Sequence, residues 1–151
     1  MAQTWTGPLR MPGRPLPAGP IPQAPGRYLA VIERGYRGSA EVQFCDLGHL
    51  SRGLHSQLGG LDVALRGSAV TFAVSAPPVP ALRIADRLLD APPDQRRSVR
   101  GLLADGAVVY VDEPDLRALG LPAGRLLPGV TCLDTSVLTD RWPDYRGVWF
   151  L

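Results

Sequence analysis

The chain of 151 residues contains no lysine and no asparagine, and it has only two cysteines and two histidines. Without lysine there is no P-loop lysine, no Schiff-base lysine and no Ser-x-x-Lys nucleophile. Without asparagine, N-glycosylation is excluded. The two cysteines are too few for a disulfide scaffold, and with two histidines they are too few for a closed zinc site of these residues alone. We therefore expect a reduced, intracellular chain without a structural metal.

Long apolar runs are also missing. Residues 1–26 lack the apolar stretch of a signal peptide, and no later run approaches the roughly 18 apolar residues of a membrane span. We therefore expect a cytoplasmic protein that does not contact a membrane. The net charge of +2 comes from Arg10 and Arg14, so residues 27–151 are balanced in charge. A balanced domain gives no electrostatic case for binding nucleic acid.

Composition divides the chain into a short tail and one domain. Residues 1–26 hold seven prolines and four glycines, a composition that favours extended, solvated conformers, and we predict that they form a disordered tail. Residues 27–151 leave room for a single core.

Within that domain, short apolar runs alternate with helical spacing. Continuous apolar runs predict strands at 28–32, 69–74, 107–111, 130–133 and 147–151. Apolar residues spaced by three and four predict helices at 47–58, 81–89, 94–104, 114–119 and 136–142. Apolar strands linked by helices are typical of a parallel sheet that is covered on both faces. The predicted fold class is α/β, a single-domain open parallel five-stranded sheet that is flavodoxin-like.

Ligands of such sheets bind outside the carboxyl ends of the strands. We therefore look for chemistry in loops 34–46, 75–80, 111–114 and 134–136. The first strand is not followed by Gly-x-Gly-x-x-Gly, so we expect no dinucleotide and predict no cofactor.

Cys45 and His49 lie at the start of the helix predicted at 47–58. The helix dipole lowers the pKa of a thiol placed there, and the four-residue spacing puts both residues on one face. They are therefore candidate catalytic residues. In the alternative interpretation, Cys45 is a small packed hydrophobe and His49 a solvent-facing polar residue. We expect Cys132, inside a predicted strand, to belong to the core.

An acidic turn follows the third predicted strand. Asp112 or Glu113 could act as a general acid or base at the rim of the sheet, and Asp115 is a candidate ligand-binding residue. The alternative is structural, because an acidic cap followed by Pro114 is what a helix start favours.

Three residues of the loop after the first strand are candidates for binding an anionic group. They are Arg34, Tyr36 and Arg37. Exposed arginines in a glycine-containing loop can equally be solvated surface.

Several segments resemble the DsrE/DsrF/DsrH superfamily, the small α/β subunits of bacterial sulfur-relay systems that include the Tus proteins. The similar segments are 28–32, 69–74, 103–111, 115–121, 127–130 and 148–151. Catalytic members carry sulfur on a cysteine just after the third strand, and some have a second cysteine three residues later. Counting back from Gly120, these positions are Asp112 and Asp115 here. The resemblance thus implies a DsrE-like member without the catalytic cysteine.

Two functions remain open. The first is a DsrE-like sulfur-relay-type subunit or binding module that acts by assembly, as a homo-oligomer or with a related subunit. The second is a small enzyme or ligand-binding protein of bacterial specialised metabolism, with an acidic and Cys/His pocket for a small molecule at the carboxyl edge of the sheet. The arginine-only, asparagine-free composition resembles that of high-GC actinobacterial genomes, where such folds are reused.

Overall fold

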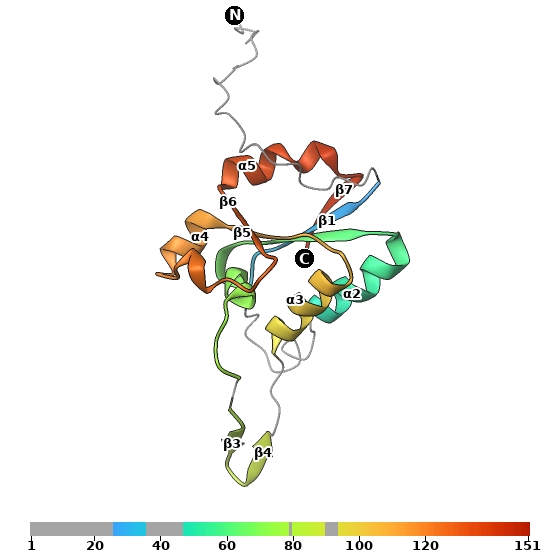
Figure 1. Cartoon of the computed structure of the whole chain (residues 1–151). Coiled ribbons are helices and arrows are strands. Elements are labelled where there is room, and N and C mark those ends of the chain that lie inside the picture. Colours follow the sequence, from blue (N-terminus) through green and yellow to red (C-terminus); the bar gives the residue numbers. More distant parts are fainter. Residues whose placement is uncertain (1–25, 36–46, 79, 90–93) are drawn as a thin grey trace, which may run out of the picture.

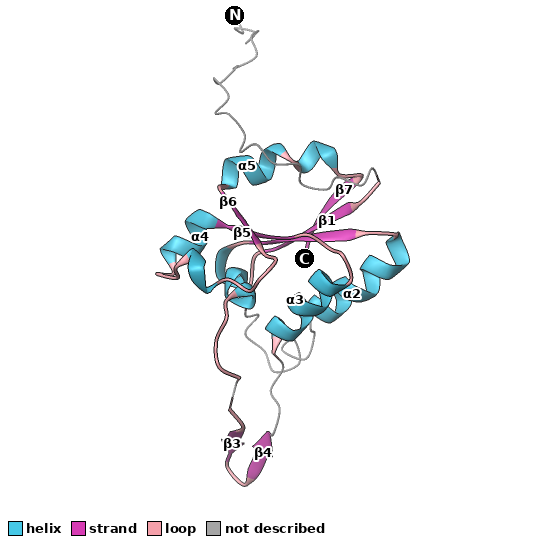
Figure 2. Cartoon of the chain, viewed as in Figure 1, coloured by secondary structure: helices cyan, strands magenta, loops and turns pink. Residues whose placement is uncertain are grey.

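The computed structural model describes residues 26–35, 47–78, 80–89 and 94–151. Its centre is a five-stranded sheet in which every strand runs parallel to its neighbours (Figures 1 and 2). Helices lie on both faces of this sheet, so the predicted α/β class with an open parallel sheet is confirmed. The tail predicted at residues 1–26 lies outside the described residues except for Gly26, and it stays a prediction.

The sheet is built from strands spread along the chain. In spatial order they are β6 (Thr131–Leu133), β5 (Val109–Asp112), β2 (Leu61–Leu65), β1 (Tyr28–Ile32) and β7 (Gly147–Phe150). The chain thus crosses the sheet in one direction from β1 to β6 and then returns to the far side of β1. Because all strands are parallel, the residues that follow them meet at one carboxyl edge.

Alternation along the strands divides the core between the two faces. On one face, Ala30 and Ile32 share a cluster with Val99 and Leu102 of α3 (Gln95–Ala104). This face also carries α2 (Leu47–Leu58), the 3-10 helix η1 (Gly67–Ala73) and α4 (Glu113–Ala118). On the other face, Leu29 and Val31 pack with Leu138 of α5 (Thr135–Asp140). Apolar residues on both faces explain the continuous apolar strands.

The second strand is not where the sequence pattern predicted it. The run 69–74 lies largely in η1, which is helical, and the strand is β2 at Leu61–Leu65. Ala69, Val70 and Ala73 are nevertheless fully buried, because η1 packs against the sheet and α3. The apolar character of the run reflected burial rather than an extended backbone. Loop 75–80 therefore does not follow a strand of the sheet.

The helix predicted at 81–89 is also wrong. This segment forms an antiparallel hairpin of β3 (Leu82–Ile84) and β4 (Arg87–Leu89), which projects away from the sheet (Figure 1). The two strands are joined by Ala85 and Asp86, and Ala85 has a φ of 54°. A positive φ is incompatible with a helix, so the turn interrupts the predicted helix at its middle.

The other predicted elements are present with small shifts at their ends. The third predicted strand ends at Asp112, which also caps α4, and Asp94 caps α3. The short 3-10 helices η2 (Ala123–Arg125) and η3 (Trp142–Asp144) complete the described elements. Among the described residues, no helix has the length and apolar character needed to cross a membrane.

Candidate functional site

The carboxyl edge brings together polar residues from four strand ends. Glu33 follows β1, Arg66 follows β2, Asp112 ends β5 and Thr135 lies two residues after β6. These residues form one connected group of hydrogen bonds and ion pairs, which we call the edge cluster.

Asp112 is the centre of the edge cluster, and it is 1% exposed. Its Oδ1 accepts a hydrogen bond from the backbone N–H of Asp115 at 3.2 Å, which caps α4. Its Oδ2 accepts from the Thr135 hydroxyl at 2.6 Å and lies 3.6 Å from Nε of Arg66. Both carboxylate oxygens are therefore engaged within the chain. The capping interpretation of Asp112 is confirmed, whereas its catalytic role stays a prediction.

The positive charge of Arg66 lies between acidic residues at the ends of β1 and β5. Besides the contact with Asp112, its Nη1 donates to Oε1 of Glu33 at 3.3 Å. The Arg66 side chain is 26% exposed and that of Glu33 is 53% exposed. The cation thus lies between a buried carboxylate and a solvated one, and part of its surface faces solvent.

Two glycines allow the loops after β1 and β2 to approach closely. Gly67 has a φ of 52°, and a Cβ there would lie 2.6 Å from the Glu33 carbonyl oxygen. A Cβ on Gly35 would lie 2.8 Å from the Ser68 carbonyl oxygen. Asp115 joins the same contact, because its Oδ2 accepts from the Gly67 N–H at 2.7 Å. These contacts hold the two loops and the start of α4 in one arrangement.

The structure describes only some of the other predicted site residues. Glu113 begins α4, and its Oε1 accepts from Arg117 at 2.8 Å. Arg34 is exposed in the loop after β1. Tyr36, Arg37 and Cys45 lie outside the described residues. His49 lies in the first turn of α2, but its side chain is also outside them.

The backbone fixes the direction of α2. Only Gly59 and Gly60 separate its end from the start of β2, so that end lies at the amino edge of the sheet and its beginning is directed toward the carboxyl edge. The predicted Cys45/His49 pair is therefore compatible with the topology and stays a prediction.

Cys132 lies in β6, is partly buried and packs against the core, as predicted. Burial raises the pKa of its thiol, and the charges of Glu113 and Asp112 raise that pKa further. Because the thiolate is the reactive form, Cys132 is a poor nucleophile at neutral pH.

Arg66, Glu33 and Thr135 were not among the predicted site residues, although Thr135 lies in loop 134–136, where chemistry was expected. Arg66 directly follows the run 61–65, whose apolar residues and flanking glycines were a usable strand signal. Once that strand is assigned, Arg66 falls at the carboxyl edge.

A second polar group lies near the amino ends of the strands. Asp62 of β2 is 2% exposed and forms an ion pair with Arg27. It also accepts hydrogen bonds from the Val108 N–H at 2.8 Å and the Tyr145 hydroxyl at 3.0 Å. The Tyr145 hydroxyl lies 3.1 Å from that of Tyr110. We call these residues the amino-edge network, and its buried carboxylate is fully paired within the chain.

The donor set of the described residues does not indicate a metal centre. No group of three or more histidine, cysteine, aspartate or glutamate side chains in the described ranges is arranged to hold a metal ion.

An open five-stranded parallel sheet with helices on both faces defines a flavodoxin-like α/β fold. The Escherichia coli YchN structure is similar to this chain with a TM-score of 0.61 and 16% identity, over 83% of this chain and 99% of YchN. MTH1491 of Methanobacterium thermoautotrophicum, described as a protein of unknown function, is similar with a TM-score of 0.54 and 17% identity, over 80% of this chain and 97% of that one. At this identity the similarity shows the fold alone.

Sequence comparisons add no family. No model of a known protein family matches this chain, and no curated protein matches it. The structural likeness supports the resemblance to DsrE-like proteins at the level of fold.

Proposed function

We propose that this chain is a DsrE-like subunit that acts by assembling with other subunits and does not carry sulfur at the end of β5. The partner is another copy of the chain or a related subunit that bears the family's cysteine. One observation carries this proposal: Asp112, which the resemblance aligns with the family's sulfur-carrying cysteine, is only 1% exposed.

The surroundings of Asp112 oppose sulfur chemistry there. Its two oxygens are engaged by Asp115, Thr135 and Arg66, so the side chain holds the edge together. Glu113 and Asp115 add further negative charge at this turn, which would destabilise an anionic persulfide. A cysteine at position 112 would therefore be buried in an acidic environment.

Assembly is supported by the ends of the sheet. Within the part of the chain that the structure describes, β6 and β7 each pair with one strand, so their outer sides have no strand partner there. On β7, Phe150 is 59% exposed and contacts the edge of Trp142 at 5.6 Å between ring centroids. Exposed aromatic side chains beside an open strand are typical of surfaces that bind another protein.

Sedimentation velocity of the full chain tests the proposal. We expect a concentration-dependent shift from monomer to a larger species, either alone or with a cysteine-bearing DsrE-like subunit. A strict monomer under both conditions would contradict it. In parallel, mass spectrometry after incubation with a persulfide donor should show no added sulfur on Cys132. Added sulfur on Cys45 would instead indicate a relay role that uses a different position from the family's.

A second candidate function is supported by Arg66. Its partly exposed guanidinium lies between two carboxylates at the edge where α/β sheets bind ligands, so this edge could bind a small molecule. A thermal-shift screen with small metabolites tests this. A compound that stabilises the wild type should lose its effect in Arg66→Gln but keep it in Arg117→Gln, and equal shifts in both variants would refute a site at Arg66.

A further inference from the structure

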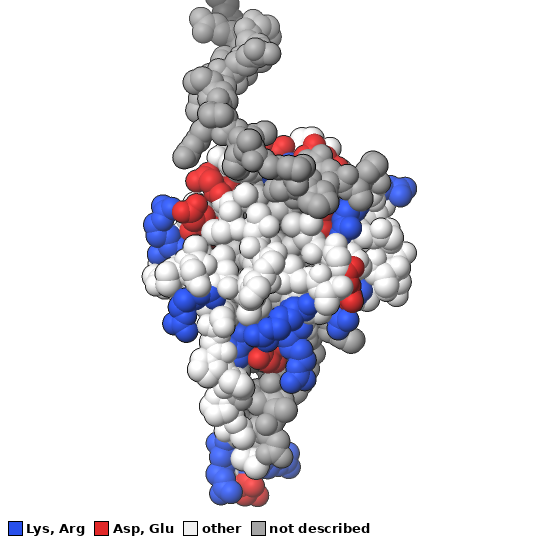
Figure 3. Space-filling model, viewed as in Figure 1, with Lys and Arg blue, Asp and Glu red and all other residues white. Residues whose placement is uncertain are grey.

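Exposed arginines gather at the end of the molecule formed by α3 and the β3–β4 hairpin. We call this the arginine surface, and its residues are Arg83, Arg87, Arg97 and Arg100. Figure 3 shows the basic side chains below the sheet and at the hairpin tip. Of the neighbouring acids, Asp94 is engaged with Arg96 at 2.6 Å, and Asp86 lies in the hairpin turn. Among the described residues of α3 and the hairpin, arginines outnumber acidic residues.

The first turn of α3 strengthens this imbalance. It contains no acidic residue, and Arg96 and Arg97 lie there instead. Positive side chains near a helix N-terminus oppose the helix dipole. This placement does not stabilise α3, but it does raise the positive potential of the surface.

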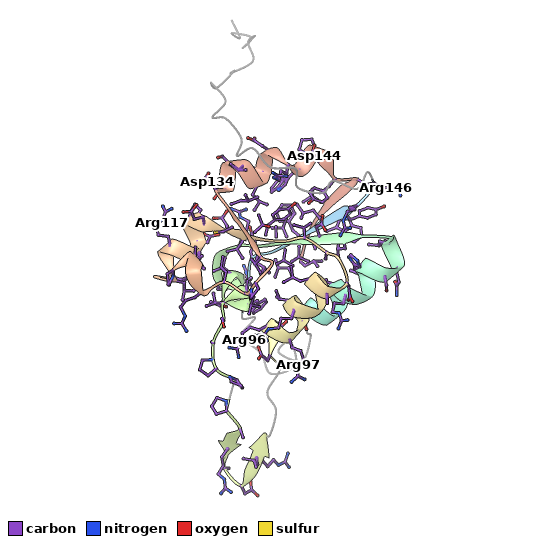
Figure 4. All side chains as sticks on the ribbon, viewed as in Figure 1. Arg96, Arg97, Arg117, Asp134, Asp144 and Arg146 are labelled. Carbon is purple, nitrogen blue, oxygen red and sulfur yellow. The ribbon has the colours of Figure 1, made fainter. Side chains whose placement is uncertain are left out.

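The opposite side of the sheet carries acidic residues. We call it the acidic surface, and its residues are Asp134, Asp140 and Asp144 of the segment containing α5 and η3. Figure 4 places Asp134 and Asp144 on this side and Arg96 and Arg97 beyond the other face of the sheet. Arg141 lies between these acids but is partly buried, and Arg146 lies 5.6 Å from the centre of the Tyr28 ring.

The hairpin adds an exposed apolar side chain to the arginine surface. A two-stranded hairpin is marginally stable in water unless it packs against another element. This hairpin projects away from the sheet, and Leu88 on β4 is 56% exposed (Figure 1). On the other side of the molecule, the exposed Phe150 lies next to Trp142 of η3. Each charged surface thus has an apolar side chain beside it.

We propose that the arginine surface of one copy binds the acidic surface of a second copy, head to tail. This inference rests on the proposed assembly and specifies its surfaces. Since the two surfaces lie on opposite sides of one molecule, the contact is heterologous, and its repetition forms a closed ring or an open filament. Charge complementarity sets the orientation of the copies, and Leu88 and Phe150 supply apolar area.

Nucleic acid is a less suitable partner for the arginine surface. The described residues of α3, β3 and β4 include no aromatic side chain on which a base could stack. Binding of nucleic acid is therefore an outcome that would contradict the proposal.

Charge reversal tests the proposal in the full chain. The two variants are Arg97→Glu with Arg100→Glu, and Asp140→Arg with Asp144→Arg, and all four residues lie outside the edge cluster. Each variant alone should associate at least about tenfold more weakly than the wild type in sedimentation velocity, because like charges then meet. An equimolar mixture should recover the wild-type sedimentation, since each variant then presents a surface opposite in charge to its partner's.

The control is Arg34→Glu with Arg117→Glu, which lowers the net charge by the same amount as Arg97→Glu with Arg100→Glu, lies outside both surfaces and should associate like the wild type. Circular dichroism must show that every variant is folded. Wild-type association in both charge-reversal variants would overturn this inference and leave the proposed assembly intact. Folded variants that fail to recover association when mixed would also overturn it, as would a DNA duplex that displaces the second copy. A wild type that never associates would instead refute the proposed assembly itself.

Discussion

Two buried carboxylates lie at opposite edges of the sheet, and each needs partners that compensate its negative charge in the interior. Asp62 and Asp112 are 2% and 1% exposed, and an unpaired charge at that depth would strongly favour unfolding. Each therefore accepts hydrogen bonds from a backbone N–H and a hydroxyl and lies near an arginine. At the residue scale, both sites are built to hold segments of the chain together.

Replacing Asp62 with alanine should lower the free energy of unfolding by about 3 kcal/mol, because Arg27 and the Val108 N–H lose their partner in the interior. Urea unfolding followed by circular dichroism measures the change. Asp105→Ala serves as the control, since it removes a carboxylate from the exposed ion pair with Arg52 and should leave the midpoint nearly unchanged. Equal losses in both variants would contradict the structural role of Asp62.

The tyrosines of the amino-edge network predict a loss of stability at high pH. Burial raises the pKa of Tyr145, and the Tyr110 hydroxyl and the Asp62 charge raise it further. Burial also raises the pKa of Tyr110, and the hydrogen bond between the two tyrosine hydroxyls partly opposes this rise. A pKa that is higher in the folded state means that the folded chain retains protons that the unfolded chain releases. The stabilisation is therefore complete below about pH 10 and declines as the pH rises further.

Urea midpoints measured between about pH 8 and about pH 11 test this dependence. The midpoint of the wild type should fall steeply over the alkaline half of this range. Tyr145→Phe should make the decline shallower, and Tyr28→Phe should not change it. A wild-type midpoint that stays constant through the range would show that the two tyrosines ionise as freely as in the unfolded chain.

At the scale of elements, the sequence predicts the helices and strands that neighbouring residues in the chain are sufficient to identify. The bounds of β1 and α2 were predicted at the residues where the structure has them, because an uninterrupted apolar run and a regular leucine spacing identify them. β2 was missed because Asp62 interrupts its apolar run. The partners that allow burial of this charge, Arg27 and Tyr145, are 35 and 83 residues away in the chain.

The residues of the candidate site also fall into two groups, those predicted from local sequence and those that depend on distant contacts. Asp112 and Asp115 were found because they follow a strand that was assigned nearly correctly. Arg66 was missed together with its strand, and Thr135 acquires its role only through a hydrogen bond to a residue 23 positions earlier. Pairings of this kind depend on the order of strands in the sheet, which periodicity does not reveal.

The β3–β4 hairpin was misassigned because its turn lacks the usual residue. A two-residue turn with a positive φ normally has glycine or asparagine there, whereas this one has Ala85 at 54°. Ala85→Gly should remove the steric cost of that conformation, which is about 1 kcal/mol. Amide exchange within the hairpin should slow by roughly fivefold, while exchange in β1 stays unchanged. Ala85→Val should have the opposite effect, and faster exchange in the glycine variant would contradict the turn geometry.

At the scale of the whole molecule, the domain is nearly neutral, but arginines and aspartates lie on opposite sides of its sheet. The charges of residues 27–151 balance along the sequence, which gave no electrostatic case for binding nucleic acid. The fold, however, places Arg97 and Arg100 of α3 on one side of the sheet and Asp140 and Asp144 of the α5–η3 segment on the other. The proposed head-to-tail contact between copies would use this separation, and it would be directional because the two charged surfaces differ in sign.

This directional attraction should weaken with salt in a way that an apolar interface would not. Between about 50 mM and about 500 mM NaCl the Debye length falls from roughly 14 Å to roughly 4 Å, so the charged surfaces are increasingly screened. We expect the association of the wild type to weaken by at least about tenfold over this range in sedimentation velocity. The Arg97→Glu and Arg100→Glu double variant should instead associate somewhat better at high salt, because its repulsion is screened. If salt strengthens association of the wild type, the contact between copies is apolar, and the open edge of β7 with Phe150 becomes the surface to mutate next.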